Sequence, residues 1–360
     1  MNAWPDKFAG TLLGMAVGDA MGLPREGLTP RRAQRLFGGP PLEYRLVFGR
    51  GMVSDDTEHA CMSAQALLAS SGDPNAFARS LAWRLRGWLL GVPAGVGLGT
   101  LRAIVKLWLG FGPRRSGVYS AGNGPAMRAP VLGVWSAARE LPPDALAALV
   151  RASTCLTHTD PRAVEGALAI ALATAYGVAV GGAGVDPGVI LAQVRRQVLG
   201  DELQARLSLV ADHLNRAAST REFVAALQLE RGVTGYINHT VPVALYCWLR
   251  WPSDFRHAVE DAIVAGGDTD TTAAIVGGLA GATLGVRAIP ESWINGLCEW
   301  PRSVTWMTRL AHRLGDAAQR KPEELPIGPL ALFWPGLLLR NPFFVVVVLA
   351  HGFRRLVPPY

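Results

Sequence analysis

The sequence predicts a mostly helical protein with one large hydrophobic core, and three observations lead to this fold class. Apolar residues recur every three or four positions in most segments, for example over residues 81–89 and 164–175. Sustained alternation of apolar and polar residues, which marks half-buried strands, is hard to find. Half of the 360 residues are hydrophobic and only 18% are charged, which excludes disorder over most of the chain. Length alone leaves one large domain or two smaller domains open.

Composition also restricts the partners and the compartment. The net charge of +7 comes from arginines that are spread along the chain in ones and twos. Because nucleic-acid binding needs the basic residues in one patch, we expect no nucleic-acid partner. The four cysteines are widely spaced without a C-x-x-C pair, which argues against a disulfide framework or a zinc ribbon. The first ten residues lack a basic region followed by an apolar stretch, so we expect no secretory signal and a cytoplasmic protein.

Two expected helices carry glycine at every fourth position: residues 10–22 and residues 277–285. Each glycine in a helix costs about 0.5–1 kcal/mol relative to alanine, so close packing of buried helix backbones is the expected compensation. Such stripes also serve packing between transmembrane helices. That alternative is weakened by Asp19 in the first stripe and by the carboxylates that precede the second.

The candidate chemistry begins at residues 53–60, VSDDTEHA, which predict a helix start. Ser54 is a natural N-cap, and Asp55 and Asp56 fall in the first turn. A second string, GGDTDTTAA at residues 266–274, precedes the second glycine-striped helix. Both strings therefore place hydroxyls and paired acids at the beginning of a helix.

The second string supplies Asp268, Asp270 and Thr271. Acids at a helix N-terminus are favoured by the helix dipole by about 0.3–1 kcal/mol, which accounts for either string by itself. Close to a core, however, clustered carboxylates repel one another unless a cation neutralises them. Carboxylate and hydroxyl oxygens suit Mg²⁺, Mn²⁺ or Ca²⁺ rather than Zn²⁺, and four carboxylates could hold two ions about 3.5–4 Å apart.

Further polar groups accompany these strings. Asp19 and Glu26 lie near the end of the first glycine-striped helix and just after it. Asn123 lies between Gly122 and Gly124, an arrangement that permits close approach of the backbone to a ligand. These residues are candidates for the same site.

Residues 157–161, THTDP, predict the start of another helix, with Asp160 as the N-cap and Pro161 in the first turn. His158 then lies on the loop that enters this helix. For His158 alone a structural role is at least as good an explanation as a functional one.

The last part of the chain differs from the rest. Residues 329–350 form two apolar runs that Arg340, Asn341 and Pro342 separate. An arginine at the centre of a membrane span costs about 2.5–3.5 kcal/mol, and Pro342 is expected to interrupt any single helix. We therefore expect a main domain over residues 1–320 and an apolar extension, residues 321–360, that docks on it. The alternative is an interfacial membrane anchor and a membrane-associated protein.

Six segments in consistent order resemble the ADP-ribosylglycohydrolase family. They are GTLLGMAVGDAMGLPRE (10–26), SDDTEHA (54–60), GNGPAMRAPVLG (122–133), THTDPRAVEGALAIALA (157–173), GYINHTVPVALYCWLR (235–250) and GGDTDTTAAIVGGLAGATLG (266–285). The resemblance implies an all-α fold, a single large helical domain with a binuclear Mg²⁺ or Mn²⁺ centre in a cleft. It also implies the metal ligands Ser54, Asp55, Asp56, Asp268, Asp270 and Thr271.

Other site residues are carried over in the same way. Glu26 matches the glutamate that is proposed to assist water activation, and the metal-liganding Asp55, Asp56 and Asp268 are alternative proton acceptors. Substrate binding is implied for Gly122, Asn123, Gly124, Tyr236 and His158. The sequence departs from the family pattern at Gly95, where many relatives have an aspartate. It also departs after residue 320, where the tail has no counterpart in the common family domain.

The function that the resemblance implies is metal-dependent hydrolysis of the bond between ADP-ribose and a protein side chain or small acceptor. The expected partner is thus an ADP-ribosylated protein or a small ADP-ribosyl molecule. Two alternatives remain: a hydrolase of a free ADP-ribose or nucleotide derivative, and a non-catalytic structural member of the family. Retention of all six expected ligands argues against the last alternative.

Overall fold

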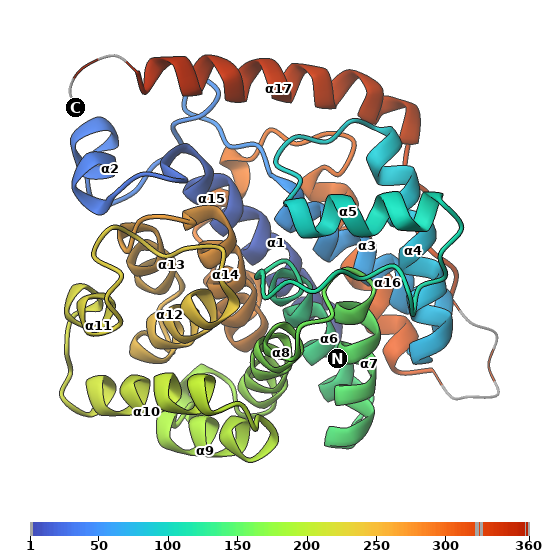
Figure 1. Ribbon diagram of the computed structural model, residues 1–360, viewed down its shortest axis with the longest axis horizontal. Coiled ribbons are helices and arrows are strands. Elements are labelled where there is room, and N and C mark those ends of the chain that lie inside the picture. The colour runs from blue at the N-terminus through green and yellow to red at the C-terminus, as the bar shows by residue number, and fades with distance from the viewer. Residues whose placement is uncertain (1–2, 321–323, 325–326, 357, 359–360) are drawn as a thin grey trace.

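The computed structural model describes residues 3–320, 324, 327–356 and 358, and these form helices without a β-strand (Figure 1). The expected all-α fold is confirmed. Residue 321, where we placed the start of the extension, lies outside the described residues. The helices are α1 (Trp4–Gly22), α2 (Pro30–Phe37), α3 (Asp55–Ser70), α4 (Pro74–Leu90), α5 (Leu98–Trp108), α6 (Ala129–Ala138), α7 (Pro143–Cys155), α8 (Pro161–Val180), α9 (Pro187–Gln197), α10 (Asp201–Asn215), α11 (Thr220–Ala226), α12 (Ile237–Arg250), α13 (Phe255–Val264), α14 (Thr269–Leu284), α15 (Glu291–Gly296), α16 (Val304–Ala318) and α17 (Leu337–Arg354).

Helices α1 and α14 form an antiparallel pair whose backbones touch. A Cβ added to Gly10, near the start of α1, would lie 2.1 Å from the carbonyl oxygen of Gly281, near the end of α14. A Cβ added to Gly22 at the other end of α1 would lie 2.4 Å from the carbonyl oxygen of Thr269, the first residue of α14. The glycine stripes thus allow the two helices to approach at a distance that any side chain would prevent, as their spacing predicted.

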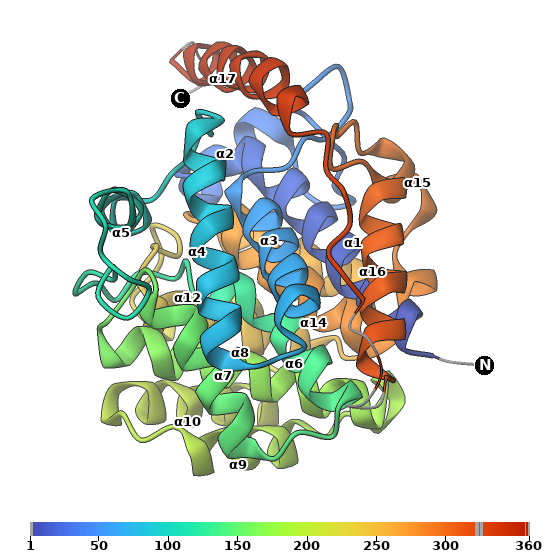
Figure 2. The same ribbon diagram turned by 90° about the vertical axis from the view of Figure 1, so that its right-hand side faces the viewer.

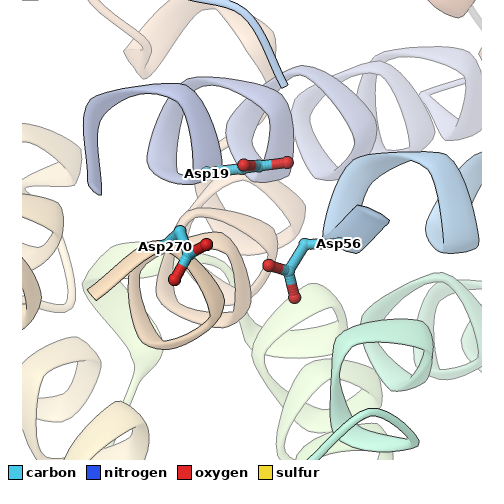
Figure 3. A group of neighbouring side chains, drawn as sticks. All are labelled: Asp19, Asp56 and Asp270. Atoms are coloured by element: carbon cyan, nitrogen blue, oxygen red, sulfur yellow. The ribbon is translucent and has the colours of Figure 1, made fainter. Parts of the chain in front are cut away.

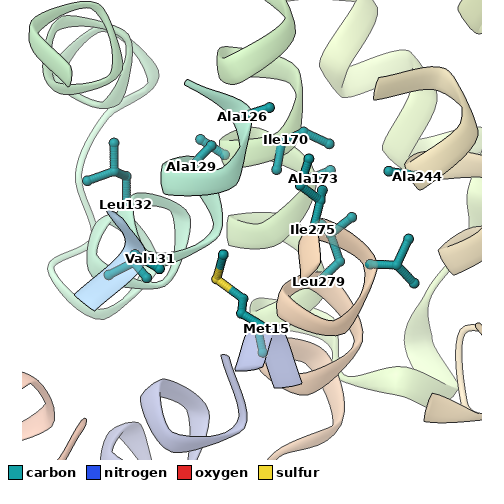
Figure 4. Close-up of a cluster of buried hydrophobic side chains, with 14 of the residues drawn as sticks. Met15, Ala126, Ala129, Val131, Leu132, Ile170, Ala173, Ala244, Ile275 and Leu279 are labelled. Atoms are coloured by element: carbon teal, nitrogen blue, oxygen red, sulfur yellow. The ribbon is translucent and has the colours of Figure 1, made fainter. Parts of the chain in front are cut away.

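The other helices pack around this pair. α16 and α3 contact α1, while α13, α12 and α8 contact α14. Where α1, α6, α8 and α14 converge, apolar side chains such as Met15, Val131, Ile170 and Ile275 fill the interior (Figure 4). α9 and α10 lie at the opposite end of the molecule from α17 (Figures 1 and 2).

The helix starts follow local signals in the sequence. Ser54 caps α3 by accepting a hydrogen bond from the backbone N–H of Asp56. Asp160 caps α8 by accepting one from the N–H of Arg162. Both predicted N-caps are confirmed. Asp268 occupies the N-cap position of α14 but makes no capping bond with its side chain, which leaves its carboxylate available for other contacts.

The expectation that Pro342 interrupts the C-terminal helix was wrong. α17 is a single helix over Leu337–Arg354 with Pro342 inside it. Proline removes one bond from the helical ladder, to the carbonyl four residues earlier. Here that carbonyl belongs to Leu338, an exposed residue in the first turn of α17, where water can satisfy it.

α17 docks on the domain through polar and apolar side chains. Arg340 is buried and pairs with Glu299 through two hydrogen bonds of 2.9 and 2.8 Å, and Asn341 donates to the carbonyl of Gly91 at 2.7 Å. The outward face is apolar and exposed: Leu338, Leu339, Phe343, Val346, Leu349 and Phe353. Among the described residues, α8 and the segment Trp334–Arg354 are long and apolar enough to cross a membrane, but α8 is mostly buried in the core.

The α1–α14 contact generates a first prediction. Gly14→Ala would place its Cβ 2.2 Å from the carbonyl oxygen of Gly277, so the helix pair must separate. We expect the free energy of unfolding to fall by about 1–3 kcal/mol in chemical denaturation. Gly87→Ala in α4 is the matched control, because the nearest atom to its added Cβ would be 3.9 Å away. This substitution should raise the free energy of unfolding by about 0.5–1 kcal/mol. Equal effects of the two substitutions would contradict the close backbone contact.

The docking of α17 generates a second prediction. A variant that ends at residue 325 loses the partner of buried Glu299 and uncovers Leu23 and Met52, which pack against Phe344. We expect a lower unfolding temperature or aggregation, measured by calorimetry and light scattering. An equally stable truncated protein, together with sedimentation of the full chain on anionic vesicles, would instead identify α17 as a membrane anchor.

Candidate metal centre and ligand cleft

Three buried aspartates from three helices converge at one point. Asp19 comes from the last turns of α1, Asp56 from the first turn of α3, and Asp270 from the first turn of α14 (Figure 3). One carboxylate oxygen of each residue lies within 4.8 Å of the others. The three side chains can therefore contact one cation together.

Asp19 connects α1 to the beginning of α3. Its carboxylate accepts hydrogen bonds from the N–H of Ser54 at 3.0 Å, the N–H of Thr57 at 3.1 Å and the hydroxyl of Thr57 at 2.6 Å. Burial raises the pKa of Asp19 to about 6, although these hydrogen bonds act to lower it. Asp19 thus holds the N-terminus of α3, and with it Asp56, against the α1–α14 pair.

The other two aspartates each have a carboxylate oxygen without a partner. Oδ2 of Asp56 accepts hydrogen bonds from the hydroxyls of Ser54 at 3.1 Å and Thr271 at 3.2 Å. Oδ1 of Asp56 and Oδ1 of Asp270 are buried and accept none. Buried polar atoms are rarely left unpaired, and two anionic oxygens without donors fit a bound cation. The donor set of carboxylates and hydroxyls suits a hard divalent ion.

The electrostatics support the same interpretation. Burial, followed by the charges of Asp55 and Asp19, raises the pKa of Asp56 well above its ordinary value. Burial, followed by the charges of Glu26 and Asp268, does the same for Asp270. Ionising these groups together is unfavourable without positive charge between them, and a divalent cation would supply it.

A cleft of about 730 Å³ opens above the aspartates. Asp270 lines this cleft, whereas Asp19 and Asp56 are buried and do not. Gly95, in the loop between α4 and α5, lies next to Asp55. Of the site residues expected from the sequence, those that line the cleft are Glu26, Ser54, Asp55, Gly122, Asn123, Gly124, His158, Asp268, Asp270 and Thr271. Segments far apart in the chain thus meet in one cavity.

Asn123 joins the glycine loop to the carboxylates. Its amide donates to Oδ2 of Asp268 at 2.6 Å and to the hydroxyl of Thr240 at 2.9 Å. Its backbone N–H donates to the carbonyl of Gly235 at 2.9 Å. The bond to Asn123 turns the Asp268 carboxylate into the cleft, which explains why it does not cap α14.

The imidazole ring of His158 occupies the space next to three glycines of the cleft. A Cβ added to Gly99, Gly122 or Gly124 would lie 2.9–3.3 Å from its imidazole ring. The ring is held by the hydroxyl of Thr157 at 2.9 Å. Burial and, to a smaller extent, the nearby Arg128 lower the pKa of His158 to about 3, so the imidazole is neutral at physiological pH. It can exchange hydrogen bonds with a ligand but is a poor proton donor.

Tyr236 is placed differently from our expectation. Its hydroxyl donates to Glu202 at 2.5 Å and accepts from Arg162 at 3.3 Å, and the residue does not line the cleft. Its backbone pairs with Gly122, so it supports the glycine loop from behind. The neighbouring Gly235 lines the cleft in its place.

Two features of the site were not foreseen as such. Asp19 was noted near the expected site but was not placed among the ligands, although a carboxylate inside a buried glycine-striped helix is a usable signal. Phe344 and Val348 of α17 also line the cleft. Nothing in the local sequence of an apolar tail indicates which part of the domain it will contact.

Comparisons with known proteins agree with this architecture. The family model for ADP-ribosylglycohydrolase matches residues 1–324. A protein of Archaeoglobus fulgidus is 32% identical over 300 residues, which cover 81% of this chain and 92% of that protein. The ADP-ribosyl-[dinitrogen reductase] glycohydrolase of Rhodospirillum rubrum is 27% identical, over 81% and 90% of the two chains. A solved structure of an ADP-ribosylglycohydrolase-related protein complex superposes with a TM-score of 0.66 at 28% identity, over 89% of this chain and all of that one.

The carboxylate cluster generates a prediction that needs no substrate. A carboxyl group whose pKa is raised by folding contributes stability that is lost as pH rises from about 4 through its folded pKa. We therefore expect the metal-free protein to be less stable at pH 8 than at pH 6. Mg²⁺ or Mn²⁺ should raise the unfolding temperature more at pH 8, because protons compete for the same oxygens at pH 6.

Asp270→Asn tests whether Asp270 is responsible for the pH dependence and for the stabilisation by metal. Removing this charge should stabilise the metal-free protein and abolish the stabilisation by metal. Asp73→Asn, at the exposed N-cap of α4, is the control, because asparagine caps a helix as well as aspartate does. If metal still stabilises the Asp270→Asn variant, Asp270 is not a metal ligand.

Proposed function

The chain belongs to the ADP-ribosylglycohydrolase family, and we propose that it hydrolyses the glycosidic bond between ADP-ribose and a protein side chain or small acceptor. The observation that carries this proposal is the pair of unpartnered oxygens, Oδ1 of Asp56 and Oδ1 of Asp270, at a cleft that Asp270 and the Asn123 loop both line. A purely structural role for the fold would not require buried carboxylates without partners.

The proposed ligands of two divalent ions, Mg²⁺ or Mn²⁺, are Ser54, Asp55, Asp56, Asp268, Asp270 and Thr271. When bound, such ions would orient the ribose hydroxyls, offset negative charge and make a bound water more acidic. Asp19 has a positioning role, since its oxygens already accept hydrogen bonds from the start of α3.

Glu26 is the proposed proton acceptor. It is exposed and lines the cleft together with Asp268 and Asp270, close enough for its charge to raise the pKa of Asp270, so it can accept a proton from a water bound over these carboxylates. In the proposed reaction the water oxygen bonds to the anomeric carbon of the ribose while the bond to the acceptor breaks. The water proton passes to Glu26, a proton then passes from Glu26 to the departing acceptor, and the net reaction adds one water across the broken bond. Asp55, Asp56 and Asp268 are the alternative acceptors.

The other side of the cleft suits the rest of ADP-ribose. Gly122, Asn123 and Gly124 allow the ligand close to the backbone, and the neutral His158 offers a hydrogen bond. The R. rubrum relative, whose name refers to an ADP-ribosylated protein, supports a protein substrate. We assign the catalytic domain to residues 1–320 and place the protein in the cytoplasm, which its four unpaired cysteines support.

The test is a panel of ADP-ribosylated arginine, ADP-ribosylated serine and free ADP-ribose derivatives, each assayed with and without a chelator. Glu26→Gln should lower kcat by about 10²–10⁴. Its affinity for ADP-ribose, measured by calorimetry, should stay close to that of the wild type. Glu43→Gln, at an exposed residue, is the control and should be fully active. An unchanged kcat in Glu26→Gln would mean that one of the aspartates accepts the proton instead. Hydrolysis in the presence of chelator would refute metal dependence.

A further inference from the structure

The C-terminal helix contributes directly to the cleft. Phe344 and Val348 lie one turn apart on the same face of α17, and both line the cavity. Phe344 is 2% exposed and packs with Leu23 and Met52, while Val348 packs at the edge of this cluster. The part of the cleft wall that α17 contributes is therefore apolar.

This apolar side is held in place at both ends. Before Phe344, Arg340 bonds to Glu299 and to the carbonyl of Val53 at 2.5 Å. After Val348, Arg355 donates to the carbonyls of Glu26 and Pro24, each at 2.7 Å. These hydrogen bonds fix α17 against the domain on both sides of Phe344 and Val348. The bonds from Arg355 also hold the turn that carries Glu26.

The contacts divide the cleft into two sides. On one side Asp268 is hydrogen-bonded to Asn123 in the glycine loop. On the other side a Cβ added to Gly95 would lie 3.2 Å from Oδ1 of Asp55, and the preceding Ala94 packs against the Phe344 cluster. The carboxylates therefore lie between a polar side and an apolar side.

If the reaction is the proposed hydrolysis, on which this inference rests, the scissile bond lies over the carboxylates. ADP-ribose, with its diphosphate and hydroxyls, fits the polar Asn123 side. The acceptor must then leave toward α17. We propose that Phe344 and Val348 form the acceptor-binding wall of the enzyme and select ADP-ribosylated acceptors that carry an apolar group next to the glycosidic bond.

The test compares two ADP-ribosylated peptides, one with leucines and one with serines on both sides of the modified residue. Wild-type enzyme should have a KM at least about ten-fold lower for the leucine peptide. Val348→Ala should remove most of this preference. Val346→Ala is the matched control, because it makes the same change two residues away on the exposed face, where Val346 is 63% exposed. Affinity for ADP-ribose itself, which has no acceptor, should be equal in all three proteins.

The outcomes separate this inference from the proposed function. Hydrolysis without a preference between the peptides, or an equal effect of Val346→Ala and Val348→Ala on KM, would overturn the acceptor wall alone. A wild-type protein that neither binds ADP-ribose nor hydrolyses either peptide would overturn both. Loss of preference in Val348→Ala with unchanged ADP-ribose affinity and an intact preference in Val346→Ala would establish the wall.

Discussion

Direct backbone contact between α1 and α14 is the constraint on which the rest of the structure depends. Glycines every four residues let the two helices touch over their whole length, from Gly10 against Gly281 to Gly22 against Thr269. This contact places Asp19 of α1 beside Asp270 of α14, and Asp19 then binds the start of α3 and carries Asp56 to the same point. The cost of helical glycine is thus spread along the pair, while the cost of buried charge falls at the end where the three carboxylates meet.

Local signals in the sequence predict much of this arrangement. The caps Ser54 and Asp160 and the acids at two helix starts depend on neighbouring residues only, so a pattern in the sequence is sufficient to find them. The glycine stripes are also local, and their spacing implies a close helical partner. What the spacing cannot give is the register that sets Asp19 against the N-terminus of α3, because that depends on the packing of helices distant in the chain.

The largest differences from expectation arise where tertiary contacts decide. Pro342 lies inside α17 because the carbonyl that it leaves without a donor belongs to an exposed residue, and because Arg340 and Asn341 fix this part of the helix. Tyr236 turns away from the cleft toward Glu202. α17 itself departs from the usual arrangement of a surface helix, because its solvent-facing side is apolar while its domain-facing side includes buried Arg340 and Asn341. A sequence pattern shows that such a helix is apolar, but not that two of its residues reach the cleft.

Calorimetric titration of the full chain with Mg²⁺ and Mn²⁺ at pH 8 measures whether the carboxylate cluster is a divalent-metal centre. We expect binding of close to two ions per chain, with release of protons from the aspartates whose pKa values burial has raised. The proton release would be visible as a dependence of the binding heat on the ionisation enthalpy of the buffer. A folded protein that binds neither ion would show that the carboxylate cluster is not a metal centre.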